Sequence, residues 1–173
     1  MRIAVITGGS SGIGAALARA LTERGWLCVL LARGPERLEQ LAGELGAEAE
    51  PCDVGDRSAV DRVAARVAKR HPAIHLLVNN AGIPAGGTFL DLPAERIEEV
   101  IRTNYLGGVW CTRAYLPLLE AGAPAHVVNV VSIAGLVTGA SSGPYAAAKH
   151  AQLAFSRGIG RELEPRGIRV LTV

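Results

Sequence analysis

Tyr145 and Lys149 lie four residues apart in the sequence, and Ser132 lies thirteen positions before the tyrosine. On a helix, residues at i and i+4 share one face. An ammonium beside a phenol stabilises the phenolate and lowers its pKa from the ordinary value of about 10. A nearby serine hydroxyl would hydrogen-bond a substrate oxygen. These residue types suit proton transfer at a carbonyl or alcohol oxygen, although a tyrosine–lysine pair on an alanine-rich helix is more often a surface contact.

A glycine-rich segment follows the apolar run at the N-terminus, and positions 7–14 read TGGSSGIG. Glycines let the backbone turn sharply and approach a pyrophosphate closely, and the N-terminus of the next helix offers free N–H groups. The segment alone would also suit a tight turn, but a strand before it and a helix after it favour a phosphate cradle. The residues expected to contact a dinucleotide here are Gly8, Ser10, Ser11, Gly12, Ile13 and Gly14.

The end of the second apolar run bears on the choice of cofactor. An NAD site normally places an Asp or Glu there to bind the ribose 2′-hydroxyl. In this chain the run ends at Ala32, and Arg33 follows in place of an acid. A guanidinium would pair with a 2′-phosphate, so the sequence favours NADP(H) over NAD(H). The alternative is a solvated arginine at a strand end.

Polar residues also follow the third and fourth apolar runs. Asp53 would accept a hydrogen bond from the adenine amine of a cofactor, or would only help to cap the next helix. Positions 79–82 read NNAG. An asparagine side chain there can tie adjacent strand ends together, and the small residues leave room for a flat cofactor.

Short apolar runs alternate with amphipathic stretches along the chain. The runs are continuous, which indicates strands covered on both faces, as in a parallel sheet. We expect strands at 3–6, 27–32, 47–51, 74–78, 127–131 and 168–173, and helices at about 13–24, 35–45, 57–70, 93–120 and 143–164. Asp56 or Ser58 would cap the third helix, and Gly25 would end the first. The pattern predicts one α/β domain over residues 1–173, a doubly wound Rossmann-type parallel sheet with helices on both faces.

Composition narrows the function classes. Hydrophobic residues make up 49% of the chain and charged residues 20%, which indicates a globular protein. The net charge of +2 is mixed along the sequence and aromatic content is 4%, so a nucleic-acid partner is not indicated. No apolar run is long enough for a membrane span. The three cysteines and four histidines lack metal-ligand spacing, so we expect no metal, reduced thiols and a cytoplasmic location.

Taken in order, these motifs resemble the short-chain dehydrogenase/reductase family, in its ordinary single-domain type with a TGxxxGxG turn. The matching positions are Gly8, Gly12, Gly14, Asp53, 79–82, Asn104, Ser132, Tyr145 and Lys149. The resemblance implies that Tyr145 is the general acid/base. Lys149 would lower its pKa and hold the nicotinamide ribose, and Ser132 would orient the substrate oxygen.

The resemblance assigns further positions. Asn104 would position a water that links Lys149 to solvent as a proton relay, or would merely satisfy backbone groups at a helix kink. Asn79, Ala81 and Gly82 would line the adenosine side of the cofactor. Ile13 would lie on the phosphate side, and Val54 would line the adenine pocket.

The implied function is an NADP(H)-dependent oxidoreductase that transfers a hydride between nicotinamide and a ketone or secondary alcohol. A 3-oxoacyl thioester and a steroid-like or xenobiotic ketone both remain open as substrates, and a homodimer or homotetramer is expected. The alternative is a catalytically weak or inactive dinucleotide-binding or interaction protein of the same fold. The family usually continues beyond its sixth strand with a Pro-Gly turn, a substrate-covering segment and a seventh strand. This sequence ends at Val173 without them, so we expect a chain truncated or incomplete at its C-terminus.

Overall fold

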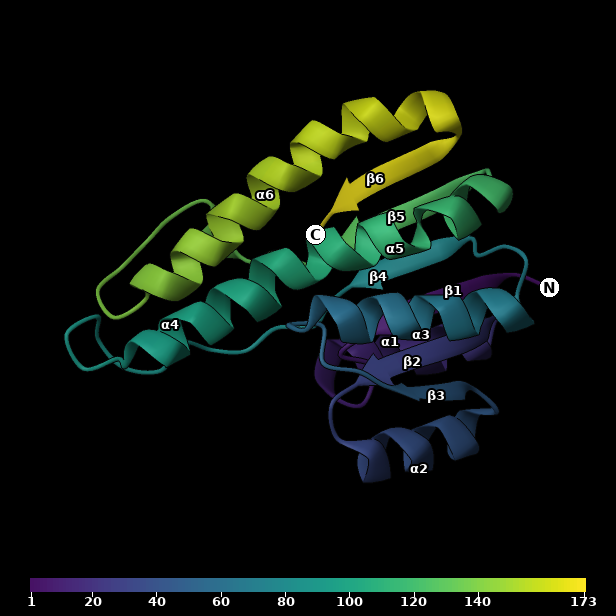
Figure 1. Cartoon of the computed structure of the whole chain (residues 1–173), viewed down its shortest axis with the longest axis horizontal. Coiled ribbons are helices and arrows are strands. Elements are labelled where there is room, and N and C mark those ends of the chain that lie inside the picture. Colours follow the sequence, from purple (N-terminus) through teal and green to yellow (C-terminus); the bar gives the residue numbers. More distant parts are fainter.

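A six-stranded parallel sheet forms the centre of the molecule in a computed structural model that describes residues 1–173 (Figure 1). The strands are β1 (Ile3–Thr7), β2 (Leu27–Ala32), β3 (Glu48–Pro51), β4 (Leu76–Asn79), β5 (Ala125–Asn129) and β6 (Ile168–Thr172). Their spatial order is β3-β2-β1-β4-β5-β6, and every neighbouring pair is parallel. The order reverses between β1 and β4, which makes a doubly wound Rossmann-type sheet and confirms the predicted fold class.

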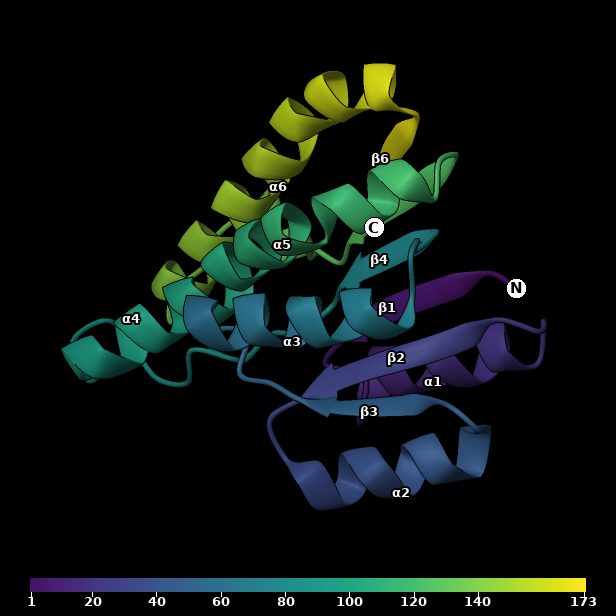
Figure 2. The same ribbon diagram turned by 45° about the vertical axis from the view of Figure 1, so that its right-hand side comes forward.

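Helices connect the strands and cover both faces of the sheet. They are α1 (Gly12–Thr22), α2 (Pro35–Leu45), α3 (Arg57–Arg70), α4 (Ala94–Ile101), α5 (Gly107–Ala121) and α6 (Gly143–Leu163). Ala18 of α1 and Leu38 of α2 pack with Ile6 in one buried cluster. Val63 of α3 and Leu119 of α5 belong to a second cluster. Figure 2 shows α3 and α5 in front of the sheet and α1 behind it.

The helix predicted over 93–120 is in fact two helices joined by a π-helical turn. This turn, η1, spans Arg102–Leu106 between α4 and α5. A π-helical turn inserts an extra residue into a helix and is frequent at functional sites. Amphipathic helix continues on both sides of the insertion, so the sequence pattern does not reveal it. The turn contains Asn104, where the sequence suggested a helix kink.

Local sequence signals explain several element ends. Asp56 caps α3, because its Oδ1 accepts a hydrogen bond from the Ser58 N–H at 2.9 Å. Gly25 follows α1 with a φ of +76°, a conformation that glycine adopts without steric cost. The fourth strand begins at Leu76, two residues later than predicted. Ile74 lies before it, and its N–H donates to the carbonyl of Leu118 instead of to a neighbouring strand.

The short edge strand β3 is held to α3 by charge. Glu50 is buried, and its carboxylate pairs with Arg66 and with Arg70, each at 2.6 Å. Buried carboxylates are stable only when paired in this way.

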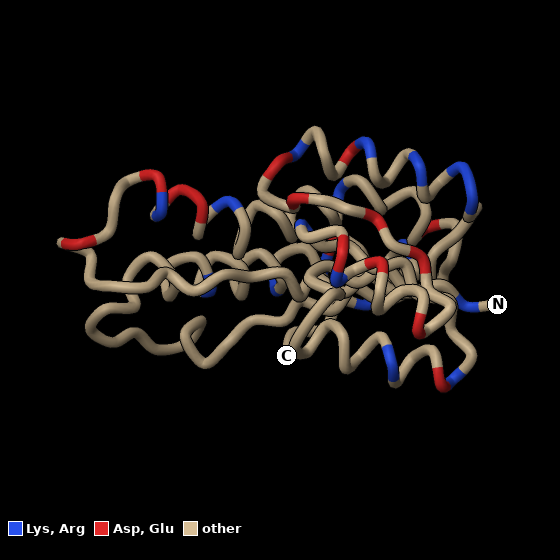
Figure 3. The backbone as a smooth tube through the Cα atoms, turned by 90° about the horizontal axis from the view of Figure 1, so that it is seen from below, with Lys and Arg blue, Asp and Glu red and all other residues tan.

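Figure 3 shows basic and acidic residues interspersed along the backbone. None of the helices is both long and apolar enough to cross a membrane.

Candidate functional site

Two adjacent cavities lie where the strands end. The carboxyl ends of the strands point toward α4 and the first half of α6 (Figure 1). One cavity of about 490 Å³ includes Tyr145 and Lys149 in its wall, and the other, of about 250 Å³, includes Arg33 and Asp53. Both share Gly82 and Ile83 as lining residues. Open α/β sheets bind ligands at this edge, beside the point where the strand order reverses.

The glycine-rich turn brings the start of α1 against the end of β1. A Cβ atom on Gly14 would lie 2.3 Å from the carbonyl oxygen of Gly8, so only glycine allows this approach. Gly12 begins α1 with a φ of +53° and has open space around it. Ser11 precedes the helix in an extended conformation, and its side chain makes no capping bond. The first N–H groups of α1 are therefore left for another acceptor, as a phosphate cradle requires.

Thr7 and Asn80 fasten the turn to the end of β4. The Thr7 hydroxyl donates to the carbonyl of Val78 and accepts from the N–H groups of Asn80 and Ala81. Asn80 Nδ2 in turn donates to the Thr7 carbonyl at 2.9 Å. An asparagine thus ties adjacent strand ends together, as expected, and the bonds fix one rim of the cavities.

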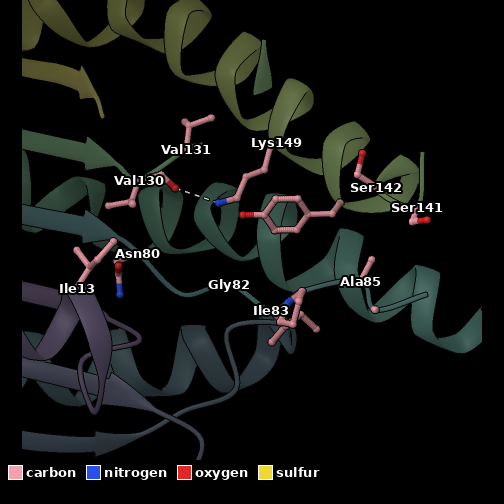
Figure 4. A pocket seen from close by; sticks show the side chains of 13 residues that line it. Ile13, Asn80, Gly82, Ile83, Ala85, Val130, Val131, Ser141, Ser142 and Lys149 are labelled. Carbon is pink, nitrogen blue, oxygen red and sulfur yellow. Dashed lines mark hydrogen bonds between the residues drawn. The ribbon is translucent and has the colours of Figure 1, made fainter. Parts of the chain in front are cut away.

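Asn79 and Asn80 have different surroundings although they are neighbours. Asn79 is 3% exposed, and its Nδ2 donates to Asn129 Oδ1 at 2.8 Å and to Thr112 Oγ1 at 3.1 Å. Its side chain joins β4, β5 and α5 inside the protein, away from both cavities. Asn80 lines the larger cavity (Figure 4). Any contact of Asn79 with a cofactor would therefore have to use its backbone.

The smaller cavity gathers residues predicted for the phosphate side and for the adenosine side of a cofactor. Its wall contains Gly8, Ser10, Arg33, Asp53, Val54, Ala81 and Gly82. Asp53 also accepts a hydrogen bond from the Gly55 N–H at 2.9 Å, within the turn before α3. Arg33 pairs with Glu99 of α4, with 3.1 Å between Nη1 and Oε1. The Arg33 side chain is about half exposed, and its other guanidinium N–H groups are not paired with a carboxylate.

Lys149 is a buried cation in the wall of the larger cavity. Its side chain is 4% exposed, and burial lowers its pKa from 10.5 to about 8. Its Nζ donates to the Val130 carbonyl at 3.0 Å (Figure 4) and to Gln152 Oε1 at 2.9 Å. The same nitrogen lies 5.9 Å from the centre of the Tyr145 ring. The helix spacing thus places both side chains on one cavity wall, together with Ile13 of α1.

Asn104 braces the loop that follows β4. Its Oδ1 accepts from the Ile83 N–H at 2.7 Å, and its Nδ2 donates to the Ile83 carbonyl at 2.8 Å. Both polar groups of the amide are therefore bonded to the backbone of one residue. The asparagine thus satisfies backbone groups beside the π-helical turn, and its role in a proton relay stays a prediction. Because Ile83 lines both cavities, Asn104 holds in place the backbone of a residue that belongs to both cavity walls.

Ser132 lies just after Val131, a lining residue of the larger cavity. Its Oγ accepts a hydrogen bond from the Ala134 N–H at 3.1 Å, as the cap of a short 3₁₀ turn at Ile133–Gly135. A hydroxyl has one hydrogen to donate besides its two acceptor positions. The capping bond therefore leaves the Ser132 hydrogen free for another oxygen.

Comparisons with known proteins agree with this geometry. The family model described as short chain dehydrogenase matches residues 2–173. The chain belongs to the short-chain dehydrogenase family. It is 37% identical to the 1-deoxy-11-beta-hydroxypentalenate dehydrogenase of Streptomyces exfoliatus, over 98% of this chain and 64% of the relative. The chain thus spans less than two thirds of that protein's length.

Solved structures of the short-chain dehydrogenase family share the fold. A variant of actinorhodin polyketide ketoreductase with NADPH superposes with a TM-score of 0.93 at 34% identity, covering 99% of this chain and 68% of that one. An alcohol dehydrogenase from the archaeon Thermococcus sibiricus, complexed with 5-hydroxy-NADP, gives 0.92 at 31% identity, covering 99% and 74%.

Some residues of the site were not predicted from the sequence. Thr103 lines the smaller cavity, and Ser141 and Ser142 line the larger one. Gln152 contacts Lys149 directly, although it was not singled out. Its position at i+3 from the lysine was a usable signal, because residues three apart on a helix share a face. The serines carry no such signal, since they reach the cavity through a loop.

Proposed function

We propose that this chain binds NADP(H) and catalyses hydride transfer between the nicotinamide and a ketone or secondary alcohol, with Tyr145 as the general acid/base. The observation that supports this proposal most strongly is that Tyr145 and Lys149 line a cavity adjoining the one beneath the glycine turn. The named relatives include a 1-deoxy-11-beta-hydroxypentalenate dehydrogenase and a polyketide ketoreductase, which supports a carbonyl–hydroxyl conversion.

The residues of the smaller cavity fit a dinucleotide phosphate. Gly8 adopts a φ of +65°, and a Cβ there would lie 2.9 Å from Asn80 Nδ2, so the turn keeps a bare backbone at the cavity. The N-terminal N–H groups of α1 would bind the pyrophosphate. Arg33 would bind the 2′-phosphate, since a guanidinium matches phosphate oxygens bidentately. Asp53 and Val54 would contact the adenine.

In the larger cavity the protein would supply orientation and a proton. A nicotinamide dinucleotide delivers or accepts the hydride when bound. Lys149 uses two of its three N–H groups on Val130 and Gln152, and the third would hold the nicotinamide ribose. Ser132 would donate its free hydrogen to the substrate oxygen, and Tyr145 would protonate that oxygen during reduction. The ammonium of Lys149 would stabilise the negative charge then left on the phenol oxygen.

The apolar part of the larger cavity favours a hydrophobic substrate beside the reacting oxygen. Six of its thirteen lining residues are hydrophobic, and ligand pockets commonly combine apolar walls with a few polar groups that fix orientation. A β-keto thioester and a fused-ring ketone both present a carbonyl next to apolar surface. Both belong in the substrate panel.

The test measures NADPH oxidation by absorbance with that panel, with NADH as the control cofactor. Tyr145→Phe should lower kcat by about 10²- to 10⁴-fold, the usual contribution of general acid–base catalysis, with NADPH affinity retained. The matched control is Tyr115→Phe, because Tyr115 is buried in the core away from the cavities. Unchanged kcat in Tyr145→Phe would refute the mechanism. NADPH binding without turnover by the wild-type chain would favour the inactive dinucleotide-binding alternative.

A further inference from the structure

Lys149 is a buried cation that lacks an acidic partner. The elements that α6 packs against are α4, η1, β5, β6, the 3₁₀ turn at Ile133–Gly135 and the turn after α6. The titratable or charged side chains on α6 and on these elements are Tyr145, His150, Arg157, Arg161 and Glu162 on α6, Glu95, Arg96, Glu98 and Glu99 on α4, Arg102 and Tyr105 in η1, His126 on β5, Glu164 and Arg166 in the turn after α6, and Arg169 on β6. No carboxylate among them pairs with Lys149. Glu99 binds Arg33 and Arg96, Glu98 binds Arg102, and Glu95, Glu162 and Glu164 are exposed.

The ammonium is instead held by two neutral oxygens. One is the carbonyl of Val130, just after β5, and the other is the side-chain oxygen of Gln152, one turn further along α6. An ammonium can only donate hydrogen bonds, so the atom that faces it must be the amide oxygen of the glutamine. Hydrogen bonds to the charged form of a group favour that form.

Gln152 is itself unusual in this position. It is 2% exposed, and a buried amide destabilises the fold unless it is hydrogen-bonded. Its side-chain oxygen accepts a hydrogen bond from Lys149. The other acceptor for the lysine is the backbone carbonyl of Val130, which does not depend on the side chain at that position. Gln152 is therefore the side chain that accepts a hydrogen bond from the ammonium.

We propose that Gln152 is the positioning residue of Lys149: it holds the ammonium against the wall of the larger cavity and keeps it protonated there. This inference deepens the proposed function, on which its catalytic meaning rests. Loss of the amide oxygen would leave the ammonium with a single hydrogen bond, so the neutral amine would be favoured and the side chain would be free to turn away. A carboxylate in place of the amide would favour the charged ammonium and hold the lysine side chain in position.

The lysine content of the chain makes a direct test possible. The chain has only two lysines, Lys69 and Lys149, so ¹³C-lysine labelling gives two ε-carbon signals in NMR spectra. Lys69 lies exposed in the last turn of α3 and serves as an internal reference. Both signals are followed from about pH 6 to about pH 11, which spans the lysine titration range.

Replacements at Gln152 should move the Lys149 midpoint in opposite directions. Gln152→Met keeps the length but loses the oxygen, and should lower the midpoint by about one pH unit. Gln152→Glu should raise it by about one unit or more. Lys69 should not move in either variant. Gln40→Met is the matched control, because Gln40 is the only other glutamine and lies exposed on α2; it should move neither signal.

Opposite shifts separate this role from simple packing, because a loosened core would move both variants the same way. If Gln152→Met fails to fold, Gln152→Leu supplies the loss of the oxygen, since a carboxylate at this position would raise the midpoint whatever the native amide does. An unchanged Lys149 midpoint in the folded variants would overturn the proposal. The titration needs neither cofactor nor turnover. Shifted midpoints in a chain without reductase activity would therefore uphold the positioning role and reject the proposed function. Unshifted midpoints in an active chain would reject the positioning role and uphold the proposed function.

Discussion

Arg33, in the wall of the smaller cavity, forms an ion pair with Glu99 of α4, with Nη1 of the arginine 3.1 Å from Oε1 of the glutamate. The two residues are 66 positions apart in the sequence. Glu99 also accepts from Arg96, whose guanidinium donates to the carbonyl of Ala85 at 3.2 Å. Ala85 lines the larger cavity. The arginine proposed to bind the cofactor phosphate is thus linked through α4 to the wall of the substrate cavity.

This pairing predicts opposite effects of two substitutions on NADPH affinity. Arg33→Ala should weaken NADPH binding by about tenfold, the loss of a charge-assisted hydrogen bond, and leave NADH binding nearly unchanged. Glu99→Gln should tighten NADPH binding by up to about fivefold, because Arg33 no longer has to leave an exposed ion pair. Isothermal titration calorimetry with both cofactors measures the constants.

The control for these variants is the Arg19–Glu44 pair. It is also exposed, has a 2.8 Å separation and lies between α1 and α2, outside both cavities. Arg19→Ala and Glu44→Gln should leave both cofactor affinities as they are. A loss of NADH affinity equal to that of NADPH in Arg33→Ala would show that the arginine does not read the 2′-phosphate.

Gly14 should not tolerate even a methyl group. Its added Cβ would lie 2.3 Å from the Gly8 carbonyl oxygen, so Gly14→Ala should lower the free energy of unfolding by about 1–3 kcal/mol through overpacking. Gly43→Ala is the matched control within α2, where no atom lies within 4 Å of the new Cβ. That variant should gain about 0.5–1 kcal/mol, because alanine favours helix more than glycine. Urea unfolding measures both, and equal effects would contradict the close approach.

Tyr115 has a buried phenol oxygen without a hydrogen-bond partner. Burial also raises the pKa of this phenol, so it stays neutral. Tyr115→Phe removes a polar atom that the fold does not satisfy, and should leave the free energy of unfolding unchanged or raise it by about 1 kcal/mol. Thermal and urea unfolding provide the measurement. A clear destabilisation would indicate that a water or another group satisfies the hydroxyl.

Lys149 should make stability depend on alkaline pH. Its pKa is lowered from 10.5 to about 8 in the folded chain. Between these values the unfolded chain binds the extra proton, so the free energy of unfolding rises with pH. Each pKa unit corresponds to about 1.4 kcal/mol, which gives a full effect of about 3 kcal/mol. Below about pH 8 both states are charged, and above pH 10.5 both are neutral, so the effect levels off on either side.

The effect of Lys149 is isolated by subtracting the stability of Lys149→Met from that of the wild type at each pH. The subtraction is needed because burial raises the pKa of Cys52 to about 11, which lowers stability as pH rises above the ordinary thiol pKa. Cys52 is present in both chains, so its contribution cancels. A difference that stays flat from about pH 8 to pH 10.5 would contradict the lowered pKa.

Local patterns of the sequence determined the architecture. Continuous apolar runs alternating with amphipathic stretches predicted six strands and the helices between them. This was possible because a strand buried on two faces and an amphipathic helix each produce a recognisable pattern within a short stretch of sequence. The glycine turn and the i,i+4 spacing of Tyr145 and Lys149 are equally local, and the structure places both at the cavities. The family resemblance rested on the same short segments, and the family match confirms it.

Tertiary structure alone decided which side chains meet. The sequence could not tell that Asn80, rather than Asn79, turns its side chain to the cavity, because that choice depends on packing between β4, β5 and α5. The π-helical turn, the ion pair of Arg33 with Glu99 and the grip of Asn104 on Ile83 are of the same kind. The ion pair and the Asn104 bonds join segments whose separation in sequence carries no periodic signal, and only the folded chain brings them within hydrogen-bonding distance. The π-helical turn is local, but the amphipathic pattern continues through it and does not reveal the inserted residue.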